Sequence, residues 1–229
     1  MKNTAAPKTE KITAPKAARA RAPAAPKPAA STRETRGAER RETILMAALD
    51  EFSARGFEST RLEDVAKRAG IAKGTVYLYF RDKETLFQEL VREMLSPVLG
   101  GIEATRSADL PVGKLSEILV DLFVREIYET RRKDVIRLMI TEGRRFPKLA
   151  EFYYREVLSP IFDALRGLLK RASAHGPVPQ ALIEFPQLIA APAVIAIIWN
   201  GLFESYEPLD VRKMLKAHID LMLAPRGAL

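Results

Sequence analysis

Residues 61–80 read RLEDVAKRAGIAKGTVYLYF, and this stretch decides how the N-terminal half is interpreted. Aromatic residues this close together usually mark a core, so the lysines and arginines around them need a reason. Two short helical segments meet at a tight turn, residues 69–72 (AGIA), because glycine commonly follows a helix end. Two helices joined in this way predict a helix-turn-helix, whose second helix enters the major groove of DNA.

The second helix of this motif has two distinct faces. At 100° per residue, Val76 and Phe80 fall on one stripe, which should be buried. Gly74, Thr75 and Leu78 fall roughly opposite and form a small central face suited to base edges. Gly74 has no side chain, so it permits a close approach of the backbone to DNA.

Hydroxyl groups and cations flank that small face. Tyr77 and Tyr79 lie on its two sides, where their hydroxyls can reach phosphates. Lys73 and Lys83 bracket the helix with positive charge. The alternatives are that the tyrosines are partly core residues and that the lysines are only solvated.

The remainder of the chain also reads as helices, and no convincing alternating strand is found. A helix is expected from about Ala38 to a stop at Gly56. Thr60 and Glu63 have the spacing of a capping box, and Asp82 is the expected N-cap of a longer helix. Pro160 is an expected kink. Further apolar stripes lie near 115–123, 135–140, 151–172, 186–203 and 208–223.

The predicted fold is therefore all-α, with about nine helices. It comprises an N-terminal three-helix helix-turn-helix domain at 38–98, with the motif at 61–80, and a C-terminal helical ligand-binding and dimerisation domain at 99–229.

The first 37 residues have a different composition. Residues 1–30 contain five prolines and no aromatic residue, which predicts disorder; a transit peptide is the alternative, but the prolines argue against a continuous helix. Residues 1–40 carry ten Lys or Arg and three Glu, a net of +7 out of +8 for the whole chain. A basic tail favours a polyanion partner, so a nonspecific polyanion binder is a second hypothesis.

Several functional classes find no support in the composition. The chain has no cysteine, and its two histidines, His175 and His218, stand in no metal-ligand spacing. We expect no metal, no cofactor and no catalytic residue. An enzyme that turns over a substrate in the C-terminal half is a third hypothesis, which these absences disfavour. No apolar run is long enough for a membrane span and no secretory signal is found, so a cytoplasmic, nucleoid-associated protein is expected.

The stretch from Arg40 to Leu95 resembles the DNA-binding domain of TetR-family transcriptional regulators. In the C-terminal half, EGRRFP at 142–147, followed by an aromatic-rich helix, resembles the AcrR/AefR-like ligand-binding halves of that family. The residues that carry the first resemblance are Arg41–Ile44, Ala47, Ala48, Phe52, Gly56, Phe57, Thr60, Val65, Ala66, Ala69, Gly70, Lys73–Tyr77, Tyr79, Phe80, Lys83, Glu84 and Leu86.

The resemblance implies a homodimeric repressor that binds a palindromic DNA operator and is released by a small molecule. Activation in place of repression stays open. It also implies DNA contacts: a base or its phosphate for Thr75, the groove for Lys73 and Gly74, phosphates for Tyr77, Tyr79 and Lys83, and the DNA backbone for Thr60 and Arg61.

Leu78 departs from the family pattern, because many relatives carry a His, Trp or Tyr at this position. Its side chain either packs on a thymine methyl group or contributes nothing.

The segment Leu188–Phe203 is apolar almost all round, so it must bury more than one face. A dimer interface formed with the last helix, through about 186–203 and 208–223, is expected; a central helix of a monomer is the alternative. Asn200 lies in this apolar run and needs a partner, which is a ligand, another side chain or a dimer contact. The residues expected to line a pocket for an unknown small-molecule effector are Phe123, Ile127, Met139, Phe152, Tyr153, Trp199 and Asn200.

Overall fold

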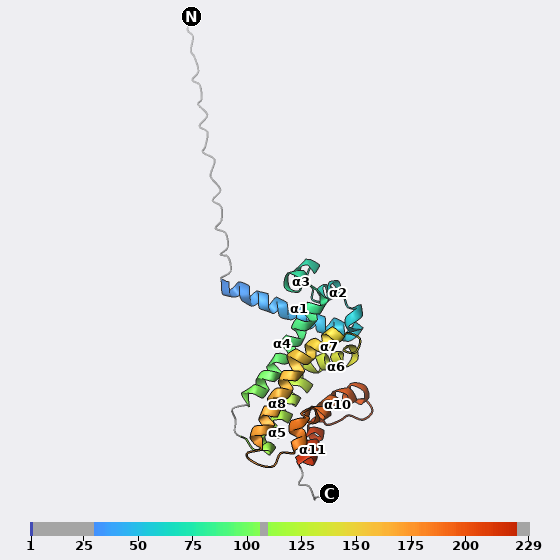
Figure 1. Ribbon diagram of the computed structural model, residues 1–229. Coiled ribbons are helices and arrows are strands. Elements are labelled where there is room, and N and C mark those ends of the chain that lie inside the picture. Colours follow the sequence, from blue (N-terminus) through green and yellow to red (C-terminus); the bar gives the residue numbers. More distant parts are fainter. Residues whose placement is uncertain (2–29, 106–109, 224–229) are drawn as a thin grey trace. The chain divides into compact units, whose positions relative to one another are not determined.

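The computed structural model describes residues 1, 30–105 and 110–223, and every regular element among them is a helix (Figure 1). Since η1 continues α5 and η2 joins α7 to α8, the described residues form ten continuous helices, which confirms the all-α prediction. The elements are α1 (Ala30–Ser59), α2 (Leu62–Arg68), α3 (Lys73–Tyr79), α4 (Lys83–Ala104), α5 (Val112–Leu122), η1 (Phe123–Tyr128), α6 (Arg132–Glu142), α7 (Pro147–Tyr153), η2 (Tyr154–Leu158), α8 (Ser159–Ala172), α9 (Gln180–Glu184), α10 (Gln187–Phe203) and α11 (Val211–Leu223).

The chain divides into two units, Met1–Gly37 and Ala38–Leu229. Most of the predicted disordered tail, residues 2–29, lies outside the described residues. Residues 30–37 are helical, so α1 begins at Ala30, earlier than the expected start near Ala38. The last proline before this helix is Pro28, and nothing after it prevents helical hydrogen bonding.

A first core joins the helix-turn-helix to part of the C-terminal half. Buried residues of α1 to α4 share it with residues of α6, α7 and η2. The Phe57 ring packs between those of Phe52, Phe87 and Phe146, with centroid separations of 4.9 to 5.6 Å. The expected boundary between residues 98 and 99 falls inside α4, so this helix runs continuously from one half to the other.

The helix-turn-helix forms where the sequence indicates it. Gly70 adopts a φ of +66° in the turn, a region that glycine enters without strain, and the Ile71 N–H donates to the Ala66 carbonyl at 3.0 Å. Val76 and Phe80 are fully buried, as expected. Asp82 accepts from the Thr85 N–H at 2.7 Å and is the expected N-cap of α4.

Two smaller cores organise the C-terminal half. One joins the end of α4 to α5 and α8, and the other joins α5 and η1 to α10 and α11. The short helix α9 was not expected. Pro160, where a kink is expected, is the second residue of α8, and the π-helical segment η2 ends directly before this helix. Because proline has no N–H, the turn that precedes it cannot keep the regular hydrogen-bond pattern.

Candidate DNA interface and internal cavity

The outward face of α3 is apolar, aromatic and open. Leu78 is 83% exposed, and Tyr77 and Tyr79 beside it are 46% and 36% exposed. Gly74, one turn earlier, is exposed, and a β-carbon placed on it would meet nothing within 4 Å. The fold itself therefore gives no reason for a glycine or an exposed leucine here, while a flat partner such as a base-pair edge does. Thr75 is half-buried beside this face.

The cations around α3 fall into two groups: those held by contacts within the protein, and those that are exposed and have no ion-pair partner among the described residues. Lys73 forms an ion pair with Glu63 at 2.5 Å; this hydrogen bond raises the pKa of Lys73 and lowers that of Glu63. Lys83 donates to the Glu58 carbonyl at 2.8 Å and lies 4.7 Å from the centroid of the Phe57 ring, and its burial lowers its pKa. Both lysines are thus held in place by the protein.

Arg61, by contrast, is exposed at the N-cap of α2 and has no ion-pair partner among the described residues. Lys67, in the last turn of α2, is also exposed, and it was not singled out from the sequence. These two side chains can turn toward a phosphate without breaking a contact within the protein.

Thr60 requires a correction. Its side chain is 1% exposed, and its hydroxyl donates to the carbonyls of Gly56 at 2.8 Å and Glu51 at 3.1 Å. The N-cap of α2 is Arg61, and no side chain caps that helix. Thr60 therefore caps carbonyl groups at the C-terminal end of α1, and the predicted capping box at the start of α2 is wrong. Because the Thr60 side chain is buried, it is not available for a contact with DNA.

A cavity of about 540 Å³ lies in the C-terminal half, within the size range of small-molecule sites. It is lined by residues of α4, α5, η1, α6, α7, η2, α8, α10 and α11. Three of the seven residues expected from the sequence line it: Phe123, Ile127 and Tyr153.

The other four expected pocket residues do not line it. Met139 and Phe152 are buried in the first core, shared with the helix-turn-helix. Trp199 donates its indole N–H to the Glu207 carbonyl at 2.8 Å. Asn200 is buried and binds protein groups alone: its amide exchanges two 2.9 Å hydrogen bonds with the Leu209 backbone and also donates to the Tyr128 hydroxyl.

Both π-helical segments of the described residues border the cavity. η1 contributes Phe123 and Ile127, η2 contributes Val157 and Leu158, and Tyr153 directly precedes η2. π-Helical turns are rare and concentrate at functional sites. The 3.6-residue periodicity gives no signal for them, because the extra residue is set by tertiary packing.

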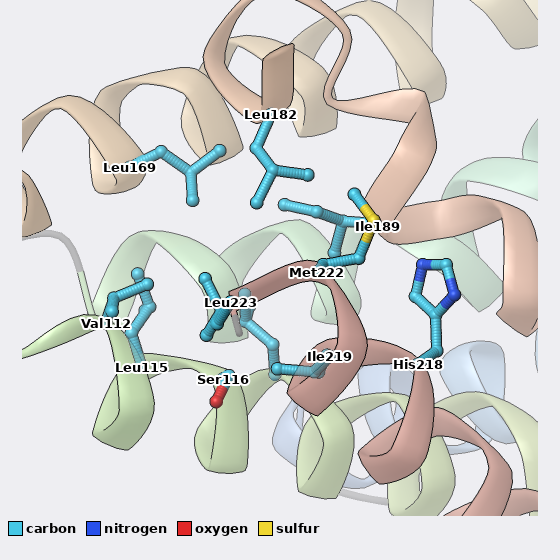
Figure 2. Close-up of a pocket in the computed structure, with 11 residues that line it drawn as sticks. Val112, Leu115, Ser116, Leu169, Leu182, Ile189, His218, Ile219, Met222 and Leu223 are labelled. Carbon is cyan, nitrogen blue, oxygen red and sulfur yellow. The ribbon is translucent and has the colours of Figure 1, made fainter. Parts of the chain in front are cut away.

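A second, far smaller space of about 30 Å³ lies between α5, α8, α9, α10 and α11 (Figure 2). It is mainly apolar, with His218 at its edge; the His218 Nε2 lies 3.0 Å from the Leu188 carbonyl oxygen. This volume holds a water molecule or two at most, so it is no site for an effector.

Polar contacts link the cavity half to the helix-turn-helix through the start of α6. Arg131 pairs with Asp50 of α1 at 2.8 Å, and Arg132 donates to the Met94 carbonyl of α4 at 2.6 Å. At the other end of α6, the carboxylate of Glu142 lies against Gly56, where α1 is interrupted at a φ of +76°.

One face of α10 is apolar and uncovered. Its exposed side chains are Leu188, Val194, Ile195, Leu202 and Phe203. Val194 and Ile195 also line the cavity, so the cavity reaches this uncovered face. No helix within the described residues is long and apolar enough to cross a membrane.

Family comparisons agree with this arrangement. Residues 44–90 match the family described as bacterial regulatory proteins, tetR family, and residues 115–224 match the C-terminal domain of AefR-like transcriptional repressors. AcrR of Shigella flexneri is 26% identical over 190 residues, covering 81% of this chain and 88% of AcrR. RutR of Escherichia coli K12 is 31% identical over 134 residues, which cover 57% of this chain and 55% of RutR.

Solved structures share the fold at low identity. SmeT in complex with triclosan aligns with a TM-score of 0.67 and 21% identity over 83% of this chain and 94% of SmeT. FadR of Bacillus subtilis in complex with stearoyl-CoA aligns with a TM-score of 0.66 and 19% identity, over 80% of this chain and 97% of FadR. The relatives named by sequence are transcriptional regulators, not enzymes. With one match over the helix-turn-helix and another over most of the helices that line the cavity, the chain belongs to the TetR family of DNA-binding transcriptional regulators.

Proposed function

We propose that the protein is a homodimeric repressor that binds a palindromic operator and is released from it by a small molecule. The observation that carries the DNA-reading part is the outward face of α3. Leu78 is almost fully exposed there and Gly74 leaves open space, although neither feature serves the fold. Thr75, Tyr77 and Tyr79 supply hydroxyls around this face, and Arg61, Lys67, Lys73 and Lys83 supply the positive charge for phosphates.

The cavity and its polar links support the response to a ligand. The η1 segment borders the cavity and leads directly to Arg131 and Arg132, which hold α1 and α4. A ligand that favours one arrangement of η1 therefore changes how the helix-turn-helix is held. Two proteins of the same fold bind small molecules, triclosan in SmeT and stearoyl-CoA in FadR, which is consistent with this role.

The uncovered face of α10 supports a homodimer. A twofold axis brings the same apolar patch of two chains together and sets two α3 helices against successive major grooves, about 34–36 Å apart. Ligand binding then shifts the population toward dimers whose α3 helices no longer fit that spacing.

The DNA-reading part is tested by selecting bound fragments from genomic DNA and measuring affinity for the selected site against scrambled DNA. Tyr77→Ala should lower the affinity for the selected site by about tenfold or more, since it removes a phosphate contact at the reading face. Tyr206→Ala, which removes an 86% exposed tyrosine far along the chain, is the matched control. Equal affinity of the wild type for any DNA would sink the operator proposal.

The dimer is tested by sedimentation. Leu202→Glu places a charge on the uncovered face of α10 and should give monomers. Ile140→Glu makes the same change at a 45% exposed position of α6 and should leave the dimer intact. A wild-type protein that sediments as a monomer at micromolar concentration contradicts the proposal.

Nonspecific binding through the basic tail remains the rival account. Deleting residues 2–29 removes the tail but leaves α1 whole. If selectivity for the selected site survives, the tail supplies only salt-sensitive, sequence-independent affinity. If binding disappears altogether, the tail is the main DNA-binding element and the helix-turn-helix proposal fails.

A further inference from the structure

The lining of the 540 Å³ cavity is informative about the chemistry of its occupant. Not one of the residues that line it is charged, and only two have polar side chains, Tyr153 and Gln187. Gln187 is exposed at the first position of α10, so it meets water. Tyr153 is half-buried, so it is the less exposed of the two polar groups in the cavity wall.

Tyr153 is held in a defined place. It is the last residue of α7 and the N-cap of η2, and its ring packs against the first core. Its hydroxyl has no hydrogen-bond partner among the described residues, and burial is the sole cause that raises its pKa to about 12. The hydroxyl therefore stays protonated at neutral pH and is available to a molecule in the cavity.

An ionised ligand does not fit this lining. A buried carboxylate, phosphate or ammonium group needs an opposite charge or several hydrogen bonds to replace its hydration, and the wall supplies neither. A neutral group that forms one hydrogen bond needs one partner, which Tyr153 provides. The rest of the wall is built of aliphatic and phenyl groups, which favour a hydrocarbon or ring system.

Building on the ligand-responsive function proposed above, we infer that the effector is an uncharged, mainly apolar molecule with one hydrogen-bonding group, which the Tyr153 hydroxyl engages. The same wall rejects fatty-acid carboxylates, phosphate esters and organic cations of similar size. Tyr153 is thus a specificity-determining residue of the cavity, and Gln187 marks where the cavity meets solvent.

The test uses the full-length protein and four probes that share a ten-carbon chain: decanol, methyl decanoate, decanoate and decyltrimethylammonium. Each probe competes with the neutral fluorescent dye N-phenyl-1-naphthylamine, and its effect on binding to the selected DNA is measured in parallel. Decanol and methyl decanoate should bind at least about 100-fold more tightly than the two ions, because burying an unpaired charge is costly.

Two conservative variants isolate the hydroxyl. Tyr153→Phe should weaken decanol and methyl decanoate about 3- to 10-fold, the usual effect of one lost neutral hydrogen bond, and should leave dye affinity unchanged. Tyr154→Phe removes the same group from the next residue, which is 58% exposed and outside the cavity wall, and should change nothing. Unfolding curves of both variants confirm that each is folded.

The outcomes separate this inference from the proposed function. If an ion binds as tightly as the neutral probes and releases DNA, the ligand class is wrong while ligand-responsive repression stands. If the neutral probes are preferred but Tyr153→Phe behaves as the wild type, the assignment of the hydroxyl is wrong. If neither the dye nor any probe binds, the cavity is no ligand site, and the proposed release mechanism falls with it.

Discussion

Asp50 of α1 and Arg131, the residue before α6, form an ion pair with 2.8 Å between Oδ1 and Nη2. The Arg131 Nε also donates to Asp134 at 2.7 Å, and the other Asp50 oxygen lies 3.9 Å from Arg68 of α2. These hydrogen bonds, to Asp134 first and to Asp50 second, raise the pKa of Arg131. The pair connects the segment that follows η1 with both α1 and α2 of the helix-turn-helix.

The first prediction concerns this connection. Because both partners are about half exposed, Arg131→Met should cost less than about 1 kcal/mol of folding free energy. Affinity of the cavity for a ligand in the absence of DNA should stay the same. The ligand concentration that releases half of the DNA should shift by about threefold or more, because a contact that couples the two halves is lost.

Arg166→Met is the control for that measurement. Arg166 forms a 2.7 Å ion pair with Asp163 on the surface of α8, so the variant loses the same charge and a similar pair within one helix. Fluorescence anisotropy of labelled DNA, titrated with ligand, reports the release curve. Superimposable curves for wild type, Arg131→Met and Arg166→Met would show that the ion pair transmits nothing.

The second prediction contrasts two glycines of the helix-turn-helix. Gly74 is helical with open space around it, so Gly74→Ala should stabilise the protein and raise its free energy of unfolding by up to about 1 kcal/mol. The added methyl group stands on the DNA-reading face, so affinity for the selected DNA should fall while stability rises.

Gly70→Ala, in contrast, should lower the free energy of unfolding. At a φ of +66°, alanine is strained by about 1–2 kcal/mol, and Gly70→Asn should be milder because asparagine tolerates this region. Denaturant unfolding and DNA affinity, measured on the same preparations, check both variants. A Gly74→Ala protein that keeps full DNA affinity would remove Gly74 from the reading face.

The third prediction concerns Leu78, the most exposed side chain of α3. If Leu78 packs on a thymine methyl group, deoxyuridine should be substituted for the thymines of each half-site one position at a time. Binding should then weaken by several-fold at one of these positions and stay unchanged at the others. Leu78→Ala should weaken binding to the thymine site similarly and abolish the difference between thymine and deoxyuridine. A wild-type protein that is indifferent to deoxyuridine at every position assigns Leu78 no role in base reading.

The helix-turn-helix could be predicted from the sequence because its signals are local. A glycine turn, an N-cap at Asp82 and a buried stripe at Val76 and Phe80 all act within a few residues. Thr60 shows the limit of such reading. Its spacing to Glu63 fits a capping box, but the carbonyls of Gly56 and Glu51 come close enough to take its hydroxyl only after α1 is interrupted at Gly56.

The cavity could be predicted only in part. Apolar helix faces are recognisable in sequence, but which of two cores a face joins depends on how the helices cross. Met139 and Phe152 pack toward the helix-turn-helix instead of the cavity. The apolar run around Asn200 gives no indication that the side-chain amide of Asn200 forms hydrogen bonds with the backbone of Leu209. The π-helical segments shift the faces by a residue, which a fixed periodicity misses.

The last prediction follows from the burial of Tyr153. Its pKa is raised to about 12, while an unfolded tyrosine keeps a pKa near 10, so the folded state binds this proton more tightly. The stability that Tyr153 contributes is therefore complete below about pH 10 and is lost as the pH rises toward 12. At about pH 11.5 the loss should reach about 2 kcal/mol at most.

Tyr153→Phe isolates this effect from the other tyrosines and the lysines, which titrate in the same range. Urea unfolding of wild type and variant at several pH values between about 9 and 11.5 gives the difference in folding free energy. That difference should be constant up to about pH 10 and then move in favour of the variant, because phenylalanine has no proton to lose. A flat difference would mean that the hydroxyl meets water or a polar partner, and its assignment as the buried hydrogen-bonding group of the cavity would be wrong.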